Sequence, residues 1–322
     1  MIFNVGFLRR FIFGLSLTGM DKFWKDFGTE TSARERLRLS SNSFINGYNT
    51  ALEVNLSRTL FSELQAFDSA FRGFAYEGAG MGMAMIDYTT PGQRSRLQEF
   101  VDQAPNYTSL AYIGAGFAIA VLNLDLKRTL APMDPMQRWW AIDGCGFYNG
   151  IFRWEKTIER QWVPQKIKQY GQRAFDRGVG RSIWFMINDD IDGIIKRIQA
   201  FPEARRADIW SGIGVASTYA GGVDQATLER VKATAGEYAS YVSLGSSLAA
   251  NARYHADNIV EHNDLACSVH CGMSAREAAQ LTLQVEQGLT IEANEPVFTP
   301  QPVFEQYRET IRNRFTKVPV LA

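Results

Sequence analysis

The stretches that decide the fold are short, centred on glycine and similar to one another. They read AYEGAGMGMAM, AYIGAGFAIAV and AIDGCGFYNGI at residues 75–85, 111–121 and 141–151. Four more follow: FDRGVGRSIWF at 175–185, IWSGIGVASTY at 209–219, VSLGSSLAANA at 242–252 and SVHCGMSAREA at 268–278. Their first glycines recur after 36, 30, 34, 34, 33 and 27 residues and are Gly78, Gly114, Gly144, Gly178, Gly212, Gly245 and Gly272. This recurrence fits two short helices with their loops, so it predicts a helical repeat with each glycine near the start of a helix.

The residues between the glycines have helical periodicity. Apolar side chains recur every three or four positions, as at 97–101, 191–198 and 228–242. The glycine-bearing segments are instead small and apolar on nearly every side, which is typical of a buried helix. Each unit therefore predicts an inner helix followed by an outer amphipathic one, giving an all-α fold of about seven helical hairpins. The small inner residues favour a closed α/α toroid over an open superhelix, whose concave face is more often polar.

No linker divides the chain, so residues 1–322 are predicted to form one domain. Residues 1–17 read MIFNVGFLRRFIFGLSL, with two arginines inside an apolar run and no cleavage site after it. We expect residues 1–20 to form an amphipathic segment docked on the body, with peripheral membrane contact through Met1–Leu17 as the alternative. Residues 299–322 are expected to be a C-terminal extension in which Tyr307, Ile311 and Phe315 belong to one docking helix.

Composition limits the classes of partner. The 34 basic residues balance 34 acidic ones, and no basic stripe with interleaved aromatics is present, so nucleic acid is not expected. Three cysteines without framework spacing fit a reducing compartment. No uninterrupted apolar stretch reaches the length of a membrane span. The sequence predicts a cytoplasmic protein, with membrane association at most peripheral.

Two carboxylates occupy a special place in the repeat. Glu77 and Asp143 directly precede first glycines and are flanked by apolar residues. If the glycines mark helix starts, these side chains face the end of the ring where free N–H groups gather. A carboxyl at an apolar cavity has a raised pKa and can act as an acid or base, whereas complementarity to the helix dipole is the structural alternative. Arg181 and Asp208 are expected to shape the same mouth and to pair with each other. The candidate catalytic residues are Glu77, Asp143, Arg181 and Asp208.

The aromatic residues beside the glycine motifs predict an apolar pocket at the helix-start end, with plain core packing as the alternative. A carboxylate inside it must be neutral, hydrated or paired, and Arg181 and Arg177 are the candidate partners. The candidate substrate-binding residues are Tyr76, Tyr112, Phe117, Phe147, Trp184 and Trp210.

A second group of residues raises the question of a metal. Cys267, His270 and Cys271 have i, i+3, i+4 spacing, and His262 or Asp264 would complete four zinc ligands. The spacing matches no standard zinc signature, so we predict no metal here. A Cys271 nucleophile paired with His270 is a weaker alternative, because adjacent residues on a helix point apart. Phosphate-binding and nucleophile-elbow motifs are absent, and the sequence assigns no cofactor.

Several of these motifs together resemble the UnbL family, whose members are encoded beside the polyketide synthase of enediyne biosynthetic clusters. The matching stretches run in order along most of the chain: GFLRRFIFG at 6–14, RGFAYEGAG at 72–80, YIGAGF at 112–117, DPMQRWWAIDGCGF at 134–147, GVGRSIWF at 178–185, DIWSGIGVASTYAGG at 208–222 and residues 264–279. The resemblance implies a role between a linear conjugated polyene and the enediyne core. It carries over no catalytic residues.

The residues and the resemblance together predict an enzyme or enzyme subunit of specialised metabolism. It would hold a hydrophobic, polyene-derived intermediate in an apolar cavity, act on it by acid–base chemistry and exchange it with partner enzymes. From a different class, the chain would be a non-catalytic carrier or scaffold of a biosynthetic complex. A terpene-cyclase-like enzyme is a third hypothesis, which rests on the fold class and the aromatics alone.

Overall fold

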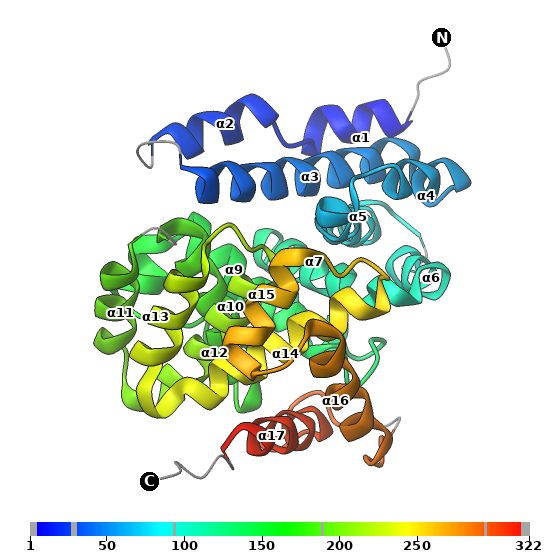
Figure 1. Ribbon diagram of the computed structural model, residues 1–322. Helices are drawn as coiled ribbons and strands as arrows, with labels where there is room; N and C mark the ends of the chain where they lie inside the picture. Colours follow the sequence, from blue (N-terminus) through cyan, green and yellow to red (C-terminus); the bar gives the residue numbers. More distant parts are fainter. Residues whose placement is uncertain (1–4, 27–30, 93–94, 188–189, 293–294, 317–322) are drawn as a thin grey trace, which may run out of the picture.

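The protein is built from helices throughout the part of the chain that its computed structural model describes (Figure 1). The described residues are 5–26, 31–92, 95–187, 190–292 and 295–316, and none of them lies in a strand. The predicted all-α class is therefore confirmed. Among these residues, no helix is both long enough and apolar enough to cross a membrane.

Long inner helices form the body, and each packs against the next one along the chain. They are α3 (Ser32–Val54), α5 (Ser69–Thr89), α7 (Thr108–Val121), α9 (Trp139–Phe152), α10 (Tyr170–Ile187), α12 (Glu203–Tyr219), α14 (Ala239–His255) and α16 (Ala275–Gln287). The shorter connecting helices are α4 (Arg58–Gln65), α6 (Arg96–Gln103), α8 (Leu126–Leu130), α11 (Ile191–Ala200), α13 (Gln225–Ala235) and α15 (Glu261–Cys271). Single turns at Pro105–Tyr107, Glu155–Glu159 and Gly236–Tyr238 complete the connections.

Side-chain caps start several of these helices. At α13 the carboxylate of Asp224 accepts a hydrogen bond from the backbone N–H of Thr227. At α16, Ser274 and Glu277 form a reciprocal capping box. Such caps satisfy N–H groups that the first helical turn leaves without a partner, so they fix where the chain re-enters the body after each loop.

Neighbouring inner helices cross at paired glycines. The second glycine of one motif lies against the first glycine of the next, as at Gly180 and Gly212. A Cβ atom on Gly212 would lie 2.0 Å from the carbonyl oxygen of Arg177, and one on Gly180 would lie 2.0 Å from that of Ile209. Only glycine permits so close a backbone approach. The packing thus offsets the roughly 1 kcal/mol that glycine costs in a helix interior.

The position of these glycines corrects two predictions. They lie inside their helices, not near the starts, because two packed helices cross away from their ends; Gly78 lies well within Ser69–Thr89. Gly272 belongs to no inner helix. It follows α15 with a φ of 70°, a left-handed C-cap conformation that favours glycine, and the last inner helix begins only at Ala275.

The amphipathic stripes are confirmed in part. The apolar positions of 97–101 are buried on α6, and those of 191–198 are buried or half-buried on α11. The stripe at 228–242 does not belong to one helix, however. Gly236 has a φ of 55° and ends α13, so the second half of the stripe lies in the following turn and in α14.

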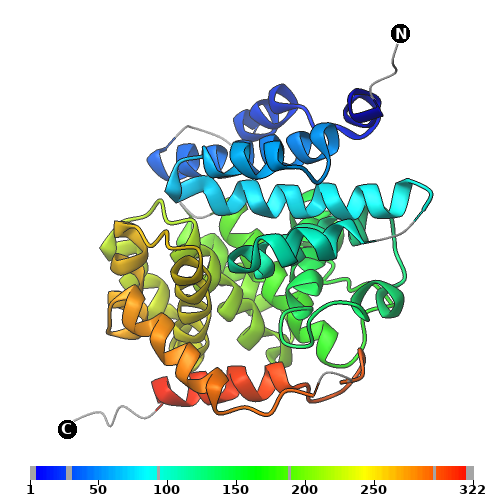
Figure 2. The ribbon, with the colours of Figure 1, turned by 90° about the vertical axis from the view of Figure 1, so that its right-hand side faces the viewer.

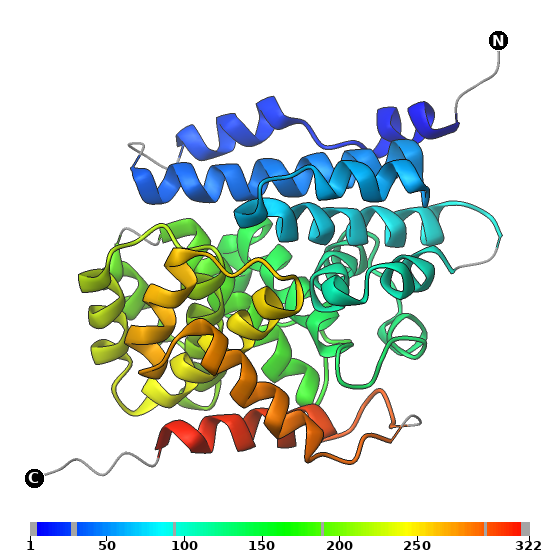
Figure 3. The same cartoon turned by 45° about the vertical axis from the view of Figure 1, so that its right-hand side comes forward.

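The two ends of the chain cover opposite sides of the body (Figures 1 and 2). Helix α17 (Val303–Thr316) packs on α14 and α16 and buries Tyr307 and Ile311, two of the residues that the sequence analysis places on one docking helix. Helices α1 (Val5–Phe13) and α2 (Leu17–Asp26) lie along α3 (Figure 3). Residues 1–4 of the predicted N-terminal segment and 317–322 of the extension lie outside the described residues.

Contacts also join inner helices that are far apart in sequence. Arg253 on α14 donates hydrogen bonds to the carbonyl oxygens of Ser69 and Ala70 at the start of α5 and of Tyr219 at the end of α12. These bonds tie α5 to α12 and α14, whose glycine motifs are the fourth and fifth after that of α5. The choice between a closed toroid and an open superhelix stays a prediction.

Candidate active site

An apolar cavity of about 400 Å³ lies between α3, α5 and the C-terminal halves of α7, α9 and α10, under α1 and α2. Most of its walls are aromatic, aliphatic or methionine side chains. Its volume is in the range of sites that hold drug-sized ligands. The lining residues include Phe44, Phe74, Met81, Phe117, Phe147 and Phe185.

The cavity is at the opposite end of these helices from the one predicted. At the helix-start end, Phe304 of α17 packs against Trp140 and Tyr170, with ring centroids 6.2 and 6.4 Å away. The C-terminal helix thus fills the helix-start end, where the sequence predicts the pocket. The free volume is left at the other end, where α1 and α2 form the cover.

Glu77 is the one carboxylic acid among the residues that line the cavity. It sits in the interior of α5, not at a helix start, with 1% of its surface exposed. Three hydroxyls of the lining are satisfied: those of Ser40, Ser41 and Tyr48 donate to backbone carbonyl oxygens at 2.9–3.0 Å. By contrast, Oε2 of Glu77 accepts no hydrogen bond from any described residue. Burial raises the pKa of Glu77 to about 7, with Arg181 acting to lower it and Asp143 to raise it.

Behind Glu77 lies a buried set of charges that we call the cavity cluster; it consists of Glu77, Asp143, Arg177 and Arg181. Arg177 Nε and Arg181 Nη1 donate to the two carboxylate oxygens of Asp143 at 2.7 and 2.6 Å. Arg181 Nη2 lies 3.8 Å from Oε2 of Glu77. The predicted arginine partners are therefore confirmed. Two guanidinium groups and two carboxylates give the cluster zero net charge with Glu77 ionised and +1 with Glu77 protonated.

Aromatic rings separate the cavity cluster from its surroundings. The guanidinium carbon of Arg181 lies 4.4 Å from the ring centre of Phe147, whose side chain also lines the cavity. Arg177 lies over Trp140 at 4.1 Å. Cation–π contact stabilises both guanidinium groups where water is excluded. Consequently Glu77 is the one member of this cluster that lines the cavity, whereas Asp143 and the two arginines lie behind the lining residues.

The repeat explains how the cluster is assembled. Arg177 and Arg181 are one turn apart on α10 and flank Gly178 and Gly180. A Cβ on Gly178 would lie 1.9 Å from the carbonyl oxygen of Asp143, so the glycine contact draws α9 against α10. This approach puts Asp143 within reach of both arginines.

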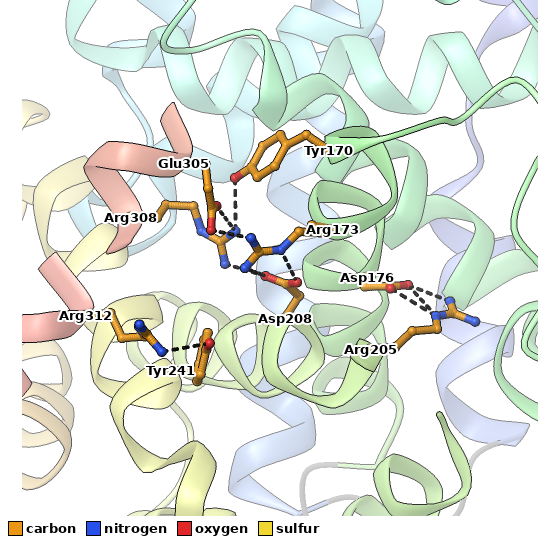
Figure 4. Close-up of polar contacts among 9 residues, drawn as sticks. All are labelled: Tyr170, Arg173, Asp176, Arg205, Asp208, Tyr241, Glu305, Arg308 and Arg312. Carbon is orange, nitrogen blue, oxygen red and sulfur yellow. Dashed lines mark hydrogen bonds and ion pairs between the residues drawn. The ribbon is translucent and has the colours of Figure 1, made fainter. Parts of the chain in front are cut away.

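Asp208 belongs to a different group of charges, shown in Figure 4. Its carboxylate accepts hydrogen bonds from Arg308 Nη2 at 2.6 Å and from Arg173 Nε at 2.8 Å. Burial would raise the pKa of Asp208, but Arg308 and Arg173 together lower it. We call this group the docking cluster, because it joins α17 to α10 and α12; it consists of Arg173, Asp208, Glu305 and Arg308. The predicted pair of Asp208 with Arg181 is wrong, and Asp208 does not line the cavity.

Asp176 is another buried carboxylate with a perturbed pKa. Burial raises that pKa to about 6, while Arg205 acts to lower it. Arg205 Nη2 and Nε donate to the carboxylate at 2.5–3.1 Å (Figure 4). Because this carboxylate is fully paired and does not line the cavity, it is a structural ion pair.

The predicted aromatic residues divide into two sets. Phe117 and Phe147 line the cavity, with ring centroids 5.5 Å apart. Tyr76 stacks on Tyr107 at 3.6 Å and accepts a hydrogen bond from Gln65, away from the cavity. The remaining three, Tyr112, Trp184 and Trp210, are buried and do not line it.

A spacing in the sequence identifies many of the lining residues, although the prediction of the pocket did not use it. They recur three and seven positions after the first glycine of a motif, the face that α-helical geometry turns to one side. On α7 and α9 these positions hold Phe117, Val121, Phe147 and Ile151, and on α5 they hold Met81 and Met85. On α10 they hold Arg181 and Phe185, which puts the arginine of the cavity cluster on the same face.

The cysteine and histidine group lies on α15, which packs against α14, and none of it lines the cavity. His270 Nδ1 is 2.8 Å from the Ser246 hydroxyl, and burial lowers the pKa of His270 to about 4. Cys267 is buried, and Cys271 Sγ contacts the Ser243 carbonyl oxygen at 3.4 Å. Among the described residues, no group of three or more His, Cys, Asp or Glu side chains is arranged to hold a metal ion.

Comparison with known proteins places the chain in a family. Neither a curated protein nor a solved structure matches it. Residues 4–315 match the family described as "Protein of unknown function (DUF1702)". The match spans the inner helices, both charge clusters and every residue that lines the cavity. The chain therefore belongs to the DUF1702 family.

Proposed function

We propose that this protein is an enzyme, or an enzyme subunit, of specialised metabolism that acts on a hydrophobic, polyene-derived intermediate by acid–base chemistry. The observation that carries the proposal is Glu77, a buried carboxyl on an apolar wall with a pKa of about 7. A group with a pKa near the working pH exchanges a proton most effectively. The similarity to the UnbL family supplies the substrate class, and the phenylalanine- and methionine-rich cavity is compatible with a conjugated chain.

Proton transfer by one carboxyl is enough for an isomerisation or a ring closure within one molecule. Protonated Glu77 adds its proton to one carbon of a conjugated chain, and the ionised carboxylate then removes a proton from another carbon. Atoms and electrons balance without an oxidant, a reductant or a second substrate. The apolar walls exclude water, which would otherwise capture a cationic intermediate.

The other charged residues of the cavity cluster act on Glu77, not on the substrate. Arg181 stabilises the ionised form, while Asp143 holds the guanidinium of Arg181 in place and offsets its charge. Asp143 and Arg181 are therefore positioning residues in this proposal. We assign Asp208 to stability, because the docking cluster satisfies it completely and it does not line the cavity.

A carrier or scaffold function is the second candidate, favoured by the exposed apolar side chains of α1 beside the cavity. A carrier would bind the same ligand, but it would not need a titrating carboxyl. The hypothesis of a terpene-cyclase-like enzyme is supported by the aromatic side chains that line the cavity and otherwise rests on fold class. We propose a cytoplasmic location with peripheral membrane contact through Met1–Leu17, and partner enzymes that supply and remove the intermediate.

The experiment that separates enzyme from carrier compares Glu77→Gln with a surface control, Glu261→Gln, which is exposed. Binding is measured with a fluorescent conjugated polyene fatty acid, and turnover is measured by mass spectrometry on a linear polyene from the partner synthase. We expect Glu77→Gln to bind the probe as the unaltered protein does and to lose turnover by about 10²–10⁴-fold. Turnover unchanged in Glu77→Gln would overturn the acid–base proposal and leave the carrier.

A further inference from the structure

Exposed apolar side chains are concentrated at the mouth of the cavity. Of the eleven large apolar side chains that are exposed among the described residues, seven lie between positions 5 and 17, on α1 and the start of α2. Two more are Val121, the last residue of α7, and Phe152, the last residue of α9. Phe11 is the most exposed of all, at 80%. An apolar surface concentrated in this way marks an interaction site. We call it the apolar rim; it consists of Val5, Phe7, Leu8, Phe11, Ile12, Leu15, Leu17, Val121 and Phe152.

The apolar rim and the cavity wall are one continuous surface. Ile12 and Leu15 are 58% and 40% exposed, and both also line the cavity. Val121 and Phe152 are 41% and 48% exposed, and they too line the cavity. A hydrophobic ligand that entered between these four residues would reach Glu77 through a cavity lined mostly by apolar side chains.

The segment that carries most of the rim is held at its turn. Backbone N–H and C=O of Leu15 are bonded to the side-chain amide of Asn49 at 3.0 and 2.9 Å, and the Tyr48 hydroxyl donates to the carbonyl oxygen of Phe13. These bonds fix the junction of α1 and α2 on α3. The exposed side chains of Ile12 and Leu15, which also line the cavity, are thereby held beside its mouth.

Basic side chains border this surface. Arg10 and Lys22 are exposed on α1 and α2, Arg9 is half-buried, and Arg153 is exposed directly after Phe152. Glu53 neutralises Arg10, and on α2 the sequence balances two lysines with two aspartates, which leaves Arg9 and Arg153 to give the border a positive charge. An apolar face with a basic border is complementary to a bilayer that contains anionic headgroups.

We infer that α1 and α2 dock on an anionic lipid bilayer, and that the cavity takes its hydrophobic ligand from the bilayer through the mouth between Ile12, Leu15, Val121 and Phe152. The inference rests on the proposed function for the use of the cavity, although it does not depend on Glu77. It explains why a water-excluding cavity opens among exposed apolar side chains. A ligand poorly soluble in water then never has to leave an apolar environment.

The docking step is tested by flotation of the full chain with two kinds of vesicle, phosphatidylcholine alone and phosphatidylcholine with phosphatidylglycerol. We expect flotation with the anionic vesicles and weaker flotation with the neutral ones. Phe11→Glu should lower binding by at least about tenfold, because burying a phenylalanine side chain contributes that much. Ile291→Glu, an equally drastic change at an exposed residue outside the rim, should bind as the unaltered protein does. Arg153→Gln should weaken binding to anionic vesicles alone, by about fivefold.

Two outcomes would overturn the inference. One is a protein that stays unbound with both vesicles while light scattering shows a dimer that Phe11→Glu dissociates; the rim would then be an interface between two copies. The other is flotation of Phe11→Glu equal to that of Ile291→Glu. Ligand loading is measured separately, as transfer of the polyene fatty acid from vesicles. Phe11→Glu should slow this transfer and leave turnover of detergent-dispersed substrate unchanged. Glu77→Gln should leave the transfer unchanged and lower the turnover. Failure of the docking inference can therefore be told apart from failure of the proposed function.

Discussion

The cavity cluster and the docking cluster are built from the same kinds of residue and share one helix, yet they differ in what they leave unsatisfied. Arg173, Arg177 and Arg181 follow one another at four-residue spacing along α10. Arg177 and Arg181 belong to the cavity cluster, and Arg173 belongs to the docking cluster. In the docking cluster both oxygens of Asp208 accept hydrogen bonds from arginines. In the cavity cluster Asp143 is equally well paired, but Glu77 keeps an oxygen without a hydrogen bond beside an apolar cavity.

This difference separates a structural role from a chemical one. Burial alone is common to all three carboxylates, so it does not mark the reactive group. Two arginines, Arg308 and Arg173, hold the pKa of Asp208 low, whereas Glu77 has only Arg181 beside it among the described residues, and burial raises its pKa to about 7. A buried ion pair is costly to break and contributes little by itself to stability, which makes the docking cluster a means of specifying where α17 lies.

The largest expected effect is on stability at the docking cluster. Asp208→Ala leaves Arg308 buried beside Arg173 without its main counter-charge, and we expect the free energy of unfolding to fall by about 3–5 kcal/mol. Urea denaturation measures this loss. Glu77→Ala should cost much less, since it removes a carboxyl that is itself destabilised by burial. Equal losses in the two variants would erase the distinction between the clusters.

The second effect is on the pH dependence of stability. The pKa of Glu77 is raised from 4.5 to about 7, so the folded protein holds this proton more tightly than the unfolded chain does. The resulting stability is fully present below pH 4.5 and is lost as the pH rises through about 7, by at most about 1.4 kcal/mol per pH unit. Urea denaturation at a series of pH values should show this loss in the unaltered protein and not in Glu77→Gln.

Asp176 contributes a similar fall in stability, because its pKa is also raised, but it does so in both proteins. The difference between the two curves therefore isolates Glu77. Curves that run parallel from pH 5 to pH 8 would show that Glu77 has an ordinary pKa.

A third effect sharpens the role of Arg181. Its positive charge lowers the pKa of Glu77, so Arg181→Met should raise that pKa further above 7. The pH profile of turnover should shift to higher pH, while probe binding should stay close to normal because Arg181 does not line the cavity. Arg173→Met, on the same helix, is the matched control and should leave the profile in place. A profile that moves equally in both variants would indicate a general loss of structure.

The smallest effect tests a single hydrogen bond. Tyr170 accepts from Arg308 at 3.0 Å at the edge of the docking cluster. Tyr170→Phe keeps the ring and removes the hydroxyl, and we expect a loss of about 1 kcal/mol with turnover unchanged. Changed turnover in this variant would mean that the two clusters are coupled through α10.

The sequence alone predicts the repeat, the all-α class and a C-terminal docking helix, because each of these depends on spacing along the chain. It names Arg177 and Arg181 as candidate partners of a buried carboxylate but leaves a neutral or hydrated carboxyl as alternatives. It did not predict the partner of Asp208, since Arg308 lies 100 residues away on a helix whose docking site no periodicity reveals. The same helix fills the helix-start end, so the cavity appears at the opposite end. The recurrence of the glycines predicts helix starts, but the glycines lie at crossings inside the helices.

The central claim is that Glu77 titrates near neutral pH inside the folded protein, and it can be measured without knowing the substrate. Infrared titration follows the carboxylic C=O stretch of Glu77 in the difference between the unaltered protein and Glu77→Gln. We expect one carboxyl that is half protonated at a pH of about 7. A Glu77 carboxyl that is fully ionised at pH 5 would contradict the assignment of this residue as the acid and base of the cavity.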